Sequence, residues 1–336
     1  MSSRPTIKQV SELAGVSFKT VSRVLNNEKH VGEDTRRRVQ DAMAALNFRP
    51  SAAARMLAGS RSFQIALLYD NPSPHYIFHL QAGAQDRCEE LGYRLLLQPV
   101  DSDAKDLARR VEGLIDEARL DGLILSPPVT EAAPLLDALV ARGVPFVRVS
   151  PGKRPGASLA VAMDDEAAVG EVVAHLVELG HRRIGHIGGP SNHSSAADRL
   201  RGFRRALRRH RLPFEPELIT AGDYTFASGR DAAARLLDRP KPPTAIFAAN
   251  DEMAAGVIAV AHERDIAVPE ALSVVGFDDA QIAQAVWPPL TTVFQPVRGL
   301  AYAATDLLLS QDGDVRSVVL SHGLVVRAST GRIAGA

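Results

Sequence analysis

The chain has 336 residues, of which 46% are hydrophobic, and its 39 basic and 39 acidic side chains give a formal net charge of zero. This length and composition supply apolar material for more than one packed core. A single cysteine, Cys88, excludes an internal disulfide and a cysteine-rich zinc site, which favours a reducing compartment. The start, MSSRPTIKQV, has no apolar signal segment, and no stretch nears the ~18 apolar residues of a spanning helix, so we expect a cytoplasmic protein with no membrane partner.

The charge is unevenly distributed along the chain. Residues 1–62 contain eleven Lys and Arg residues and five acidic ones, so this segment carries six excess positive charges and the remainder six excess negative ones. A basic head on an acidic body is typical of a nucleic-acid-binding segment attached to a second function, although solvated helix faces also carry charge.

The first of three predicted helices begins after Thr6, whose hydroxyl can cap it. Gly15 permits a tight turn because glycine accepts a positive φ, and Ser17 can cap a second helix. A third helix is predicted over residues 33–46. Two helices joined by a tight turn and supported by a third form a helix-turn-helix unit, whose second helix enters the major groove of DNA. The apolar stripe expected to face inward from the first helix is Ile7, Val10, Leu13 and Ala14.

The second helix combines a packing face with a hydrogen-bonding face. Val21, Val24 and Leu25 are spaced to pack on the neighbouring helices. Lys and Arg can donate to guanine, and an aromatic edge can pack on a thymine methyl group. A small structural domain with a charged face is the alternative interpretation. The side chains expected to point outward are Phe18, Lys19, Ser22 and Arg23.

The motif TIKQVSELAGVSFKTVSRVLNNEKHVGEDTRRRVQDAMAALNFRPSAAARMLAG, residues 6–59, closely resembles the DNA-binding head of the LacI/GalR family of bacterial transcription regulators. The resemblance implies that Phe18, Lys19 and Arg23 contact bases. It also implies a set of residues that hold phosphates or helix ends: Thr6, Ser17, Thr20, Ser22, Asn26 and His30.

Residues 50–58, PSAAARMLA, are too short for a stable isolated helix, which needs ~12–15 residues in water. We therefore expect this segment to fold only against a partner, and a flexible linker is the alternative. The family resemblance implies a hinge helix, paired copies of which lie in the minor groove with Leu57 inserted into a central base step.

From residue 64 onward, short apolar runs alternate with amphipathic stretches. This alternation predicts parallel sheets with helices on both faces, here in two lobes. The expected strands are 64–69, 93–98, 122–126, 146–150, 159–163, 183–189, 218–220, 245–249, 272–278 and 291–295.

Polar side chains follow several of these strands, at the carboxyl edge where open α/β sheets bind ligands. They are Asp70, Asn71, Ser126, Asn250, Asp251, Asp278 and Asp279. Each of them can merely cap the next helix, but together they predict a polar cleft, and Ser126 is included among the candidate ligand contacts.

The stretches HRRIGHIGGP, SAADRLRGF, TAIFAANDEMAAGV, LSVVGFDD and WPPLTTVFQP resemble the effector domain of the same family, whose fold is that of periplasmic sugar-binding proteins. The resemblance implies that Arg199 clamps the effector, that Tyr224 forms an aromatic platform, and that Asn250 and Asp278 form a polar pair. The other implied effector contacts are Asp70, Asn71, Tyr76 and Gln295. LLYDNPSPHY, LSPP and WPPLTTV resemble a subgroup that responds to glucosides or sucrose-like sugars.

The expected fold is thus an all-α helix-turn-helix head followed by an α/β effector domain of two parallel-sheet lobes. The expected domains are the head at 1–49, the hinge helix and linker at 50–62, and an effector-binding and dimerisation domain at 63–336. Its first lobe covers about 63–162 and 294–322, and its second covers about 163–293 and 323–336.

Arg, Asp and Asn beside an aromatic ring suit a sugar, because they donate to and accept from vicinal hydroxyls while the ring covers the apolar face. A purine stacked between Tyr76 and Tyr224 is the alternative effector. No nucleophile elbow, phosphate loop or complete dinucleotide motif is present, which argues against an enzyme or a cofactor. His75 and His79 lack the context of a metal site, and we expect none.

Several remaining features have plain structural interpretations. The arginine pairs at 204–205 and 208–209 are expected to be solvated helix faces, Trp287 to pack beside the cleft, and Cys88 to lie in the core. A sugar-binding protein that only transports or senses is the distant alternative, and the basic head argues against it.

The predicted function is a sequence-specific regulator, most simply a repressor of carbohydrate uptake or catabolism genes that a small sugar releases from double-stranded operator DNA. A corepressed regulator is the alternative. A pseudo-palindromic operator requires a two-fold homodimer, associated with the nucleoid when bound. We expect no tetramer, because no leucine heptads follow LVVRASTGR.

Overall fold

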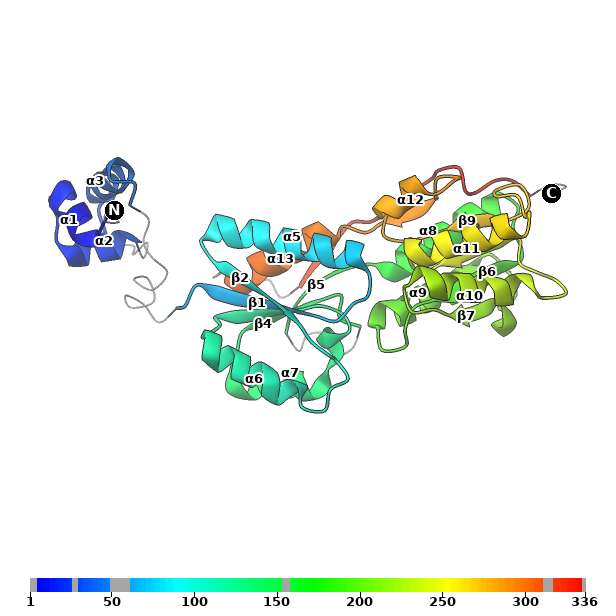
Figure 1. Cartoon of the computed structure of the whole chain (residues 1–336), viewed down its shortest axis with the longest axis horizontal. Coiled ribbons are helices and arrows are strands. Elements are labelled where there is room, and N and C mark those ends of the chain that lie inside the picture. Colours follow the sequence, from blue (N-terminus) through cyan, green and yellow to red (C-terminus); the bar gives the residue numbers. More distant parts are fainter. Residues whose placement is uncertain (1–4, 26–29, 49–60, 153–157, 311–316, 334–336) are drawn as a thin grey trace. The chain divides into compact units, whose positions relative to one another are not determined.

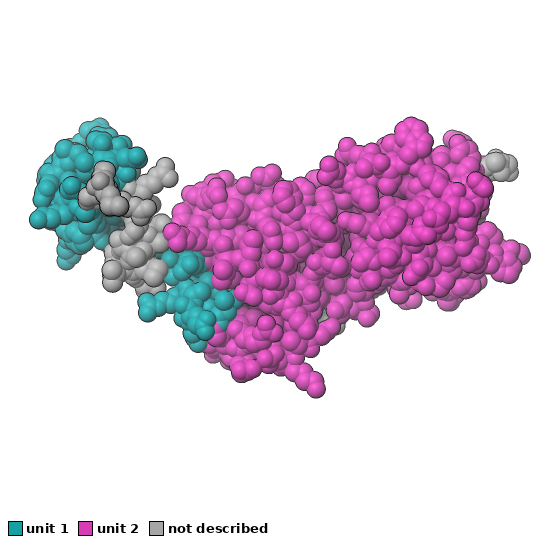
Figure 2. All heavy atoms as spheres, in the orientation of Figure 1, with its two compact units in different colours: residues 1–64, 114–121 teal, residues 65–113, 122–336 magenta. Residues whose placement is uncertain are grey.

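A computed structural model describes residues 5–25, 30–48, 61–152, 158–310 and 317–333. The chain divides into two compact units: Met1–Gln64 with Leu114–Asp121, and Ile65–Gly113 with Gly122–Ala336 (Figure 2). The predicted contacts Asn26 and Leu57, and most of the predicted hinge segment, lie outside the described residues.

The head contains the predicted helix-turn-helix. Its helices are α1 (Ile7–Ala14), α2 (Phe18–Leu25) and α3 (Glu33–Ala45). Thr6 begins α1 with a capping box: its hydroxyl accepts from Gln9 N, and Gln9 Oε1 accepts from Thr6 N at 2.7 Å. Gly15 ends α1 at φ 63°, the left-handed conformation that glycine adopts without strain.

A small apolar core and one arginine hold the three helices together. Val10 and Val21 are fully buried, and Arg38 Nη2 of α3 donates to the carbonyl oxygens of Ala14 at 2.6 Å and Gly15 at 3.1 Å. The turn between α1 and α2 is therefore tied to α3. The prediction that Leu13 faces inward is wrong: it is 57% exposed, because Val10 and Ala14 form the buried stripe and each residue turns ~100° around the helix.

The first lobe of the second unit is built around a six-stranded sheet of order β11-β5-β4-β3-β1-β2. The pairs β1–β3, β3–β4, β4–β5 and β5–β11 are parallel. Helices α5 and α13 pack together on one face, and α6 and α7 lie on the other (Figure 1). The elements are β1 (Gln64–Tyr69), α5 (Pro74–Leu91), β2 (Arg94–Pro99), α6 (Leu107–Ala118), β3 (Gly122–Leu125), α7 (Ala133–Arg142), β4 (Phe146–Val149), β5 (Leu159–Met163), α13 (Val297–Leu309) and β11 (Ser317–Leu320).

The second lobe has a four-stranded parallel sheet of order β7-β6-β8-β9. Alternation along β8 fills both cores: Ala245 and Phe247 pack with α8 and α9, whereas Ile246 and Ala248 pack with α10 and α11. The elements are α8 (Asp165–Glu178), β6 (Ile184–Gly188), α9 (Ser194–Arg209), β7 (Ile219–Ala221), α10 (Phe226–Leu237), β8 (Ala245–Ala248), α11 (Asp251–Glu263), β9 (Ser273–Val275) and α12 (Gln281–Ala285).

The chain passes between the lobes after β5, between β10 (Thr292–Phe294) and α13, and between β11 and β12 (Gly323–Val325). Strands β10 and β12 pair antiparallel. Buried Asp251 ties this region to the second lobe, because its carboxylate accepts from Thr292 Oγ1 at 2.6 Å and from Ala280 N at 2.7 Å. No helix in the described part of the chain is long and apolar enough to span a membrane.

The arginine clamp of the head gives a first prediction. Arg38→Ala should lower the free energy of local opening of α1 and α2 by about 1–2 kcal/mol, because two charge-assisted hydrogen bonds are lost. Amide hydrogen exchange on the full chain measures this energy. Arg37→Ala is the matched control and should change it by less than about 0.5 kcal/mol, since its exposed ion pair with Asp34 contributes little. Equal effects of the two substitutions would contradict the clamp.

Candidate functional site

A polar pocket in the second unit collects side chains from both lobes. Seven of the predicted effector contacts line it, joined by five residues that the sequence did not indicate. The lining residues are Asn71, Ser73, Tyr76, Pro127, Ser150, His193, Ser195, Arg199, Tyr224, Asn250, Asp278 and Gln295.

Two predicted contacts lie outside this lining. Asp70 Oδ2 accepts from Ser102 N at 2.9 Å, so its carboxylate holds the loop after β2. Ser126 is fully buried, and its hydroxyl donates to the Leu68 carbonyl oxygen at 3.2 Å. Their polar groups satisfy neighbouring backbone, and the next residue along, Pro127, reaches the pocket instead.

Arg199 of α9 is the central charge of the pocket and is only 4% exposed. Its Nε donates to Asp165 Oδ1 at 2.8 Å, its Nη1 to the Ala249 carbonyl oxygen, and its Nη2 to Gln295 Oε1 at 3.3 Å. The guanidinium carbon lies 3.6 Å from the centre of the Phe277 ring. Burial opposes this charge, but the Asp165 carboxylate, followed by Tyr224 and Asp278, raises the pKa of Arg199, so the cation is retained.

Asp278 follows the β9 strand end with φ 107°, an unusual conformation for a residue with a side chain. Its amide donates to the Val293 carbonyl oxygen at 2.9 Å, which holds it against the crossover segment. Burial raises the pKa of Asp278 to about 8, and Glu252 and Asp165 add to that effect while Arg199 opposes it. At neutral pH this carboxyl group can therefore be a donor as well as an acceptor.

Asn250 mainly positions other groups. Its Oδ1 caps α11 by accepting from Met253 N at 3.0 Å, and its Nδ2 donates to the Tyr224 carbonyl oxygen at 2.9 Å and to Glu252 Oε2 at 2.8 Å. Tyr224 has φ 68° and lies over Gly189, where an added Cβ would meet the ring at 2.3 Å. The glycine is thus required for the tyrosine to reach the pocket.

Three buried polar atoms of the lining have no hydrogen-bond partner among the described residues: Tyr76 Oη, Ser150 Oγ and His193 Nε2. Burial lowers the pKa of His193 to about 4, so the ring is neutral. His193 Nδ1 lies 3.0 Å from Asn192 Oδ1, which requires a proton on Nδ1 and leaves Nε2 as an acceptor. Unsatisfied buried groups are costly, so a ligand that pairs with them gains affinity.

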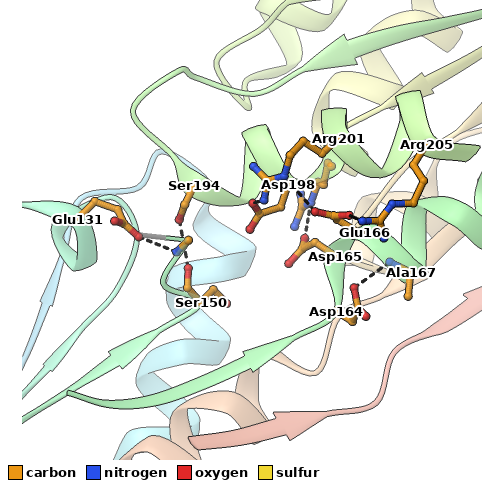
Figure 3. Close-up of polar contacts among 12 residues, drawn as sticks. Glu131, Ser150, Asp164, Asp165, Glu166, Ala167, Ser194, Asp198, Arg201 and Arg205 are labelled. Atoms are coloured by element: carbon orange, nitrogen blue, oxygen red, sulfur yellow. Dashed lines mark hydrogen bonds and ion pairs between the residues drawn. The ribbon is translucent and has the colours of Figure 1, made fainter. Parts of the chain in front are cut away.

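The two lobes already touch beside the pocket. Ser194 Oγ donates to the Ser150 carbonyl oxygen at 3.2 Å (Figure 3), and Ser73 Oγ donates to Glu252 Oε1 at 3.3 Å. Gly152 permits this approach, since a Cβ there would lie 2.4 Å from Ser194 Cβ. The free volume is about 30 Å³, room for little more than water, so a larger ligand requires the lobes to separate.

Three of the five lining residues that were not predicted from the sequence follow a strand. His193 and Ser195 follow β6 in GGPSNHSS, so the rule that ligands bind at the carboxyl edge of a sheet would also have indicated them. Ser150 likewise follows β4. Trp287, expected beside the cleft, is 77% exposed and does not line the pocket. No group of three or more potential metal ligands occurs within the described ranges.

The head presents a second candidate surface on α2. Val21 and Val24 are buried, whereas Phe18, Lys19 and Arg23 are exposed, with Phe18 at 59%. Ser17 Oγ accepts from Thr20 N at 3.1 Å and thereby holds the helix start. Thr6 is used in the capping box of α1, Ser22 is half-buried on α2, and His30 is exposed before α3.

Comparison with known proteins matches two family models. Residues 6–51 match bacterial regulatory proteins of the lacI family, and residues 173–330 match the periplasmic binding protein-like domain. The HTH-type transcriptional regulator DegA of Bacillus subtilis (strain 168) is 33% identical over 333 residues, which cover 97% of this chain and 98% of DegA.

Solved structures share the whole architecture. The lac repressor dimer bound to operator and the anti-inducer ONPF is 32% identical with a TM-score of 0.79, covering 98% of this chain and 100% of that one. The complex of the transcriptional regulator CelR with cellobiose is 30% identical with a TM-score of 0.73, covering 97% and 100%. These matches confirm the predicted helix-turn-helix head and two-lobed α/β domain.

The raised pKa of Asp278 gives a second prediction. The pKa of Asp278 is 3.8 in an unfolded chain and about 8 in the folded one, so the folded chain holds this proton more tightly. The free energy of unfolding therefore falls as the pH rises from about 4 to about 8. Asp278→Asn should remove that fall and make the protein more stable at pH 8 by at least about 1.4 kcal/mol, the value of a tenfold change in a proton equilibrium.

Thermal unfolding of both proteins between pH 6.5 and 8.5 is the measurement. Burial lowers the pKa of His186 and His193 from the usual 6.5 to about 4, so both are neutral in the folded state throughout this range. In the unfolded chain they lose their charge near pH 6.5, and this contribution is the same in the wild type and the variant, so it cancels in the comparison. Parallel stability curves for the wild type and the variant would show that Asp278 is ionised throughout.

Proposed function

Because the chain belongs to the lacI family of bacterial regulatory proteins, we propose that it is a repressor of carbohydrate uptake or catabolism genes that a small sugar releases from operator DNA. The chain is a DNA-binding transcriptional regulator and not an enzyme. The operator is pseudo-palindromic in this proposal, and the chain acts on it as a homodimer, since a two-fold site matches a two-fold protein.

The observation that carries the sugar assignment is the set of unpartnered atoms beside a buried guanidinium. Tyr76 Oη, Ser150 Oγ and His193 Nε2 require both donors and acceptors from a ligand. Sugar hydroxyls supply both, and the Tyr224 ring offers an apolar surface for a sugar face. The bound cellobiose of CelR, a protein of the same fold, supports the assignment.

Residues from both lobes act together in this proposal. Asn71 and Tyr76 grip the ligand from the first lobe, and Arg199, Tyr224 and Asp278 grip it from the second. A ligand shifts the DNA-binding equilibrium only by its different affinity for the two lobe arrangements, typically ~1–3 kcal/mol. Asp70 and Ser126 are given supporting roles at the strand ends, because they bond to backbone.

We assign DNA reading to the head, residues 1–49, and the joint between head and body to residues 50–62. Phe18, Lys19 and Arg23 contact bases in this proposal, and their exposure on α2 supports it. Residues at the helix ends, such as Thr6 and Ser17, orient the N-termini of the helices toward the phosphates of the DNA in this proposal. A hinge helix with Leu57 as its wedge belongs to the same proposal.

Tyr76 provides the sharpest test of the effector site. Because its buried hydroxyl has no partner within the described structure, Tyr76→Phe should leave the free protein as stable or more stable by about 1 kcal/mol, yet weaken sugar binding about tenfold. The control Tyr302→Phe, whose hydroxyl donates to Glu90 at 2.7 Å away from the pocket, should leave sugar affinity unchanged.

The measurement begins with a thermal-shift panel of cellobiose, sucrose, ribose and purine bases, since a ligand at 100 times its Kd adds about 2.7 kcal/mol to stability. Titration of the active ligand onto both variants follows, and then onto the operator complex. A response to purines alone would replace the sugar with a nucleobase. A sugar that tightens operator binding would make the protein corepressed, and undiminished binding by Tyr76→Phe would refute the site.

Arg23 tests base reading. Arg23→Ala should cost ~1–3 kcal/mol on an operator selected from random DNA and much less on unrelated duplex, because base contacts and not phosphate contacts are lost. Fluorescence anisotropy at one fixed salt concentration measures both affinities. Equal losses on the two duplexes would assign Arg23 to phosphate contacts, and Arg37→Ala on α3 is the control with unchanged specificity.

A further inference from the structure

The outer face of α9 carries a row of arginines that the effector pocket does not use. Side chains at i, i+3, i+4 and i+7 share one face of a helix. The opposite face is buried through Phe203 and Leu207 and also presents Arg199 to the pocket. The row consists of Arg201, Arg204, Arg205 and Arg208, all exposed.

These four arginines line a concave surface that we call the α9 groove, together with Glu166 of α8 and Phe214. Its volume is about 670 Å³. One carboxylate faces four guanidinium groups, so the lining carries three excess positive charges. The part of the chain after residue 62 has six excess negative charges, so this cluster of positive charge lies in a part of the protein that is negatively charged as a whole.

Neighbouring groups hold the guanidiniums in place. Glu166 lies between two of them, with Oε1 3.0 Å from Arg201 Nε and Oε2 3.0 Å from Arg205 Nη2 (Figure 3). Arg201 also pairs with Asp198. The guanidinium carbon of Arg204 lies 4.5 Å from the centre of the Phe214 ring. Planar donors fixed in this way lose less freedom when they bind a ligand.

Stabilisation of the helix explains only some of the arginines in this row. Basic residues near the carboxyl end of a helix interact favourably with its dipole, which suits Arg208. The pairs 201–205 and 204–208, however, place like charges at i, i+4, which disfavours the helix. Within the described part of the chain, no carboxylate forms an ion pair with Arg204 or Arg208, so their charge is not neutralised by the protein.

We propose that the α9 groove is a second ligand site, which binds a small multivalent anion of the phosphate-ester class. Each guanidinium group can donate two parallel hydrogen bonds to two oxygens of a phosphate. The Phe214 ring, with Arg204 stacked on it, forms an apolar wall for the organic part of the ester. The site is independent of the effector pocket and of the identity of the sugar. Arg204, Arg205, Arg208 and Arg209 are exposed, as expected from the sequence, and the proposal adds a ligand for part of that face.

The test uses the full-length protein and inorganic pyrophosphate as the probe, titrated by calorimetry at constant ionic strength in chloride. We expect one saturable site per chain. The double substitution Arg204→Gln with Arg208→Gln should weaken binding at least about tenfold, because two charge-assisted contacts are removed. Arg209→Gln is the matched control: it is exposed on the same helix, does not line the groove, and should change affinity less than about twofold.

Circular dichroism and thermal unfolding establish that each variant is folded, and Phe214→Leu, which removes the stacking, should weaken pyrophosphate binding without removing a charge. Citrate should bind more weakly than pyrophosphate, because its oxygens are not arranged around one tetrahedral centre. The proposal is overturned by absence of a saturable site, by unchanged binding in the double variant, by an equal loss in Arg209→Gln, or by citrate binding as tightly as pyrophosphate.

Discussion

The burial of one positive charge governs the arrangement of the effector domain. A guanidinium removed from water is tolerated only when its donors are paired, and Arg199 finds its partners on four separate segments. Asp165 lies at the start of α8, Ala249 at the end of β8, Phe277 after β9, and Gln295 on the crossover between the lobes. A ligand that contacts Arg199 therefore acts on three elements of the second lobe and on the crossover between the lobes.

The pocket around this charge is incompletely satisfied, so it offers polar atoms with which a ligand can pair. Tyr76, Ser150 and His193 each keep a buried polar atom without a partner in the described structure, while the free volume of about 30 Å³ holds little more than water. A ligand larger than water can pair with those atoms only after the lobes separate, so its binding energy is linked to lobe movement. Asp278 lies in the same pocket, and burial raises its pKa to about 8, close to neutral pH.

Helix α9 shows how a period of 3.6 residues serves several purposes at once. Its first turn brings Ser195 to the pocket, its inner face buries Phe203 and Leu207, and its outer face carries the arginines of the α9 groove. The same residue type has opposite environments on this helix. Arg199 is fixed by an internal carboxylate, whereas Arg204 rests on an aromatic ring and faces solvent.

The sequence by itself determined most of the elements and their order, although it did not predict strands β11 and β12. Periodicity predicted the strands and helices, strand-end polar residues predicted Asn71, Asn250 and Asp278 at one edge, and the family resemblance supplied Arg199, Tyr76, Tyr224 and Gln295. The sequence could not distinguish Asp70 and Ser126, whose side chains bond to backbone groups, from the residues that line the pocket. It also could not show that Leu13 lies outside the core of the head. Those outcomes, the unpartnered atoms of Ser150 and His193, and the groove that Glu166 and Phe214 form with α9 were decided by the tertiary structure alone. The physical reason is that local pattern fixes which way a side chain points along its own element, whereas satisfaction of a polar group depends on segments that meet only after folding.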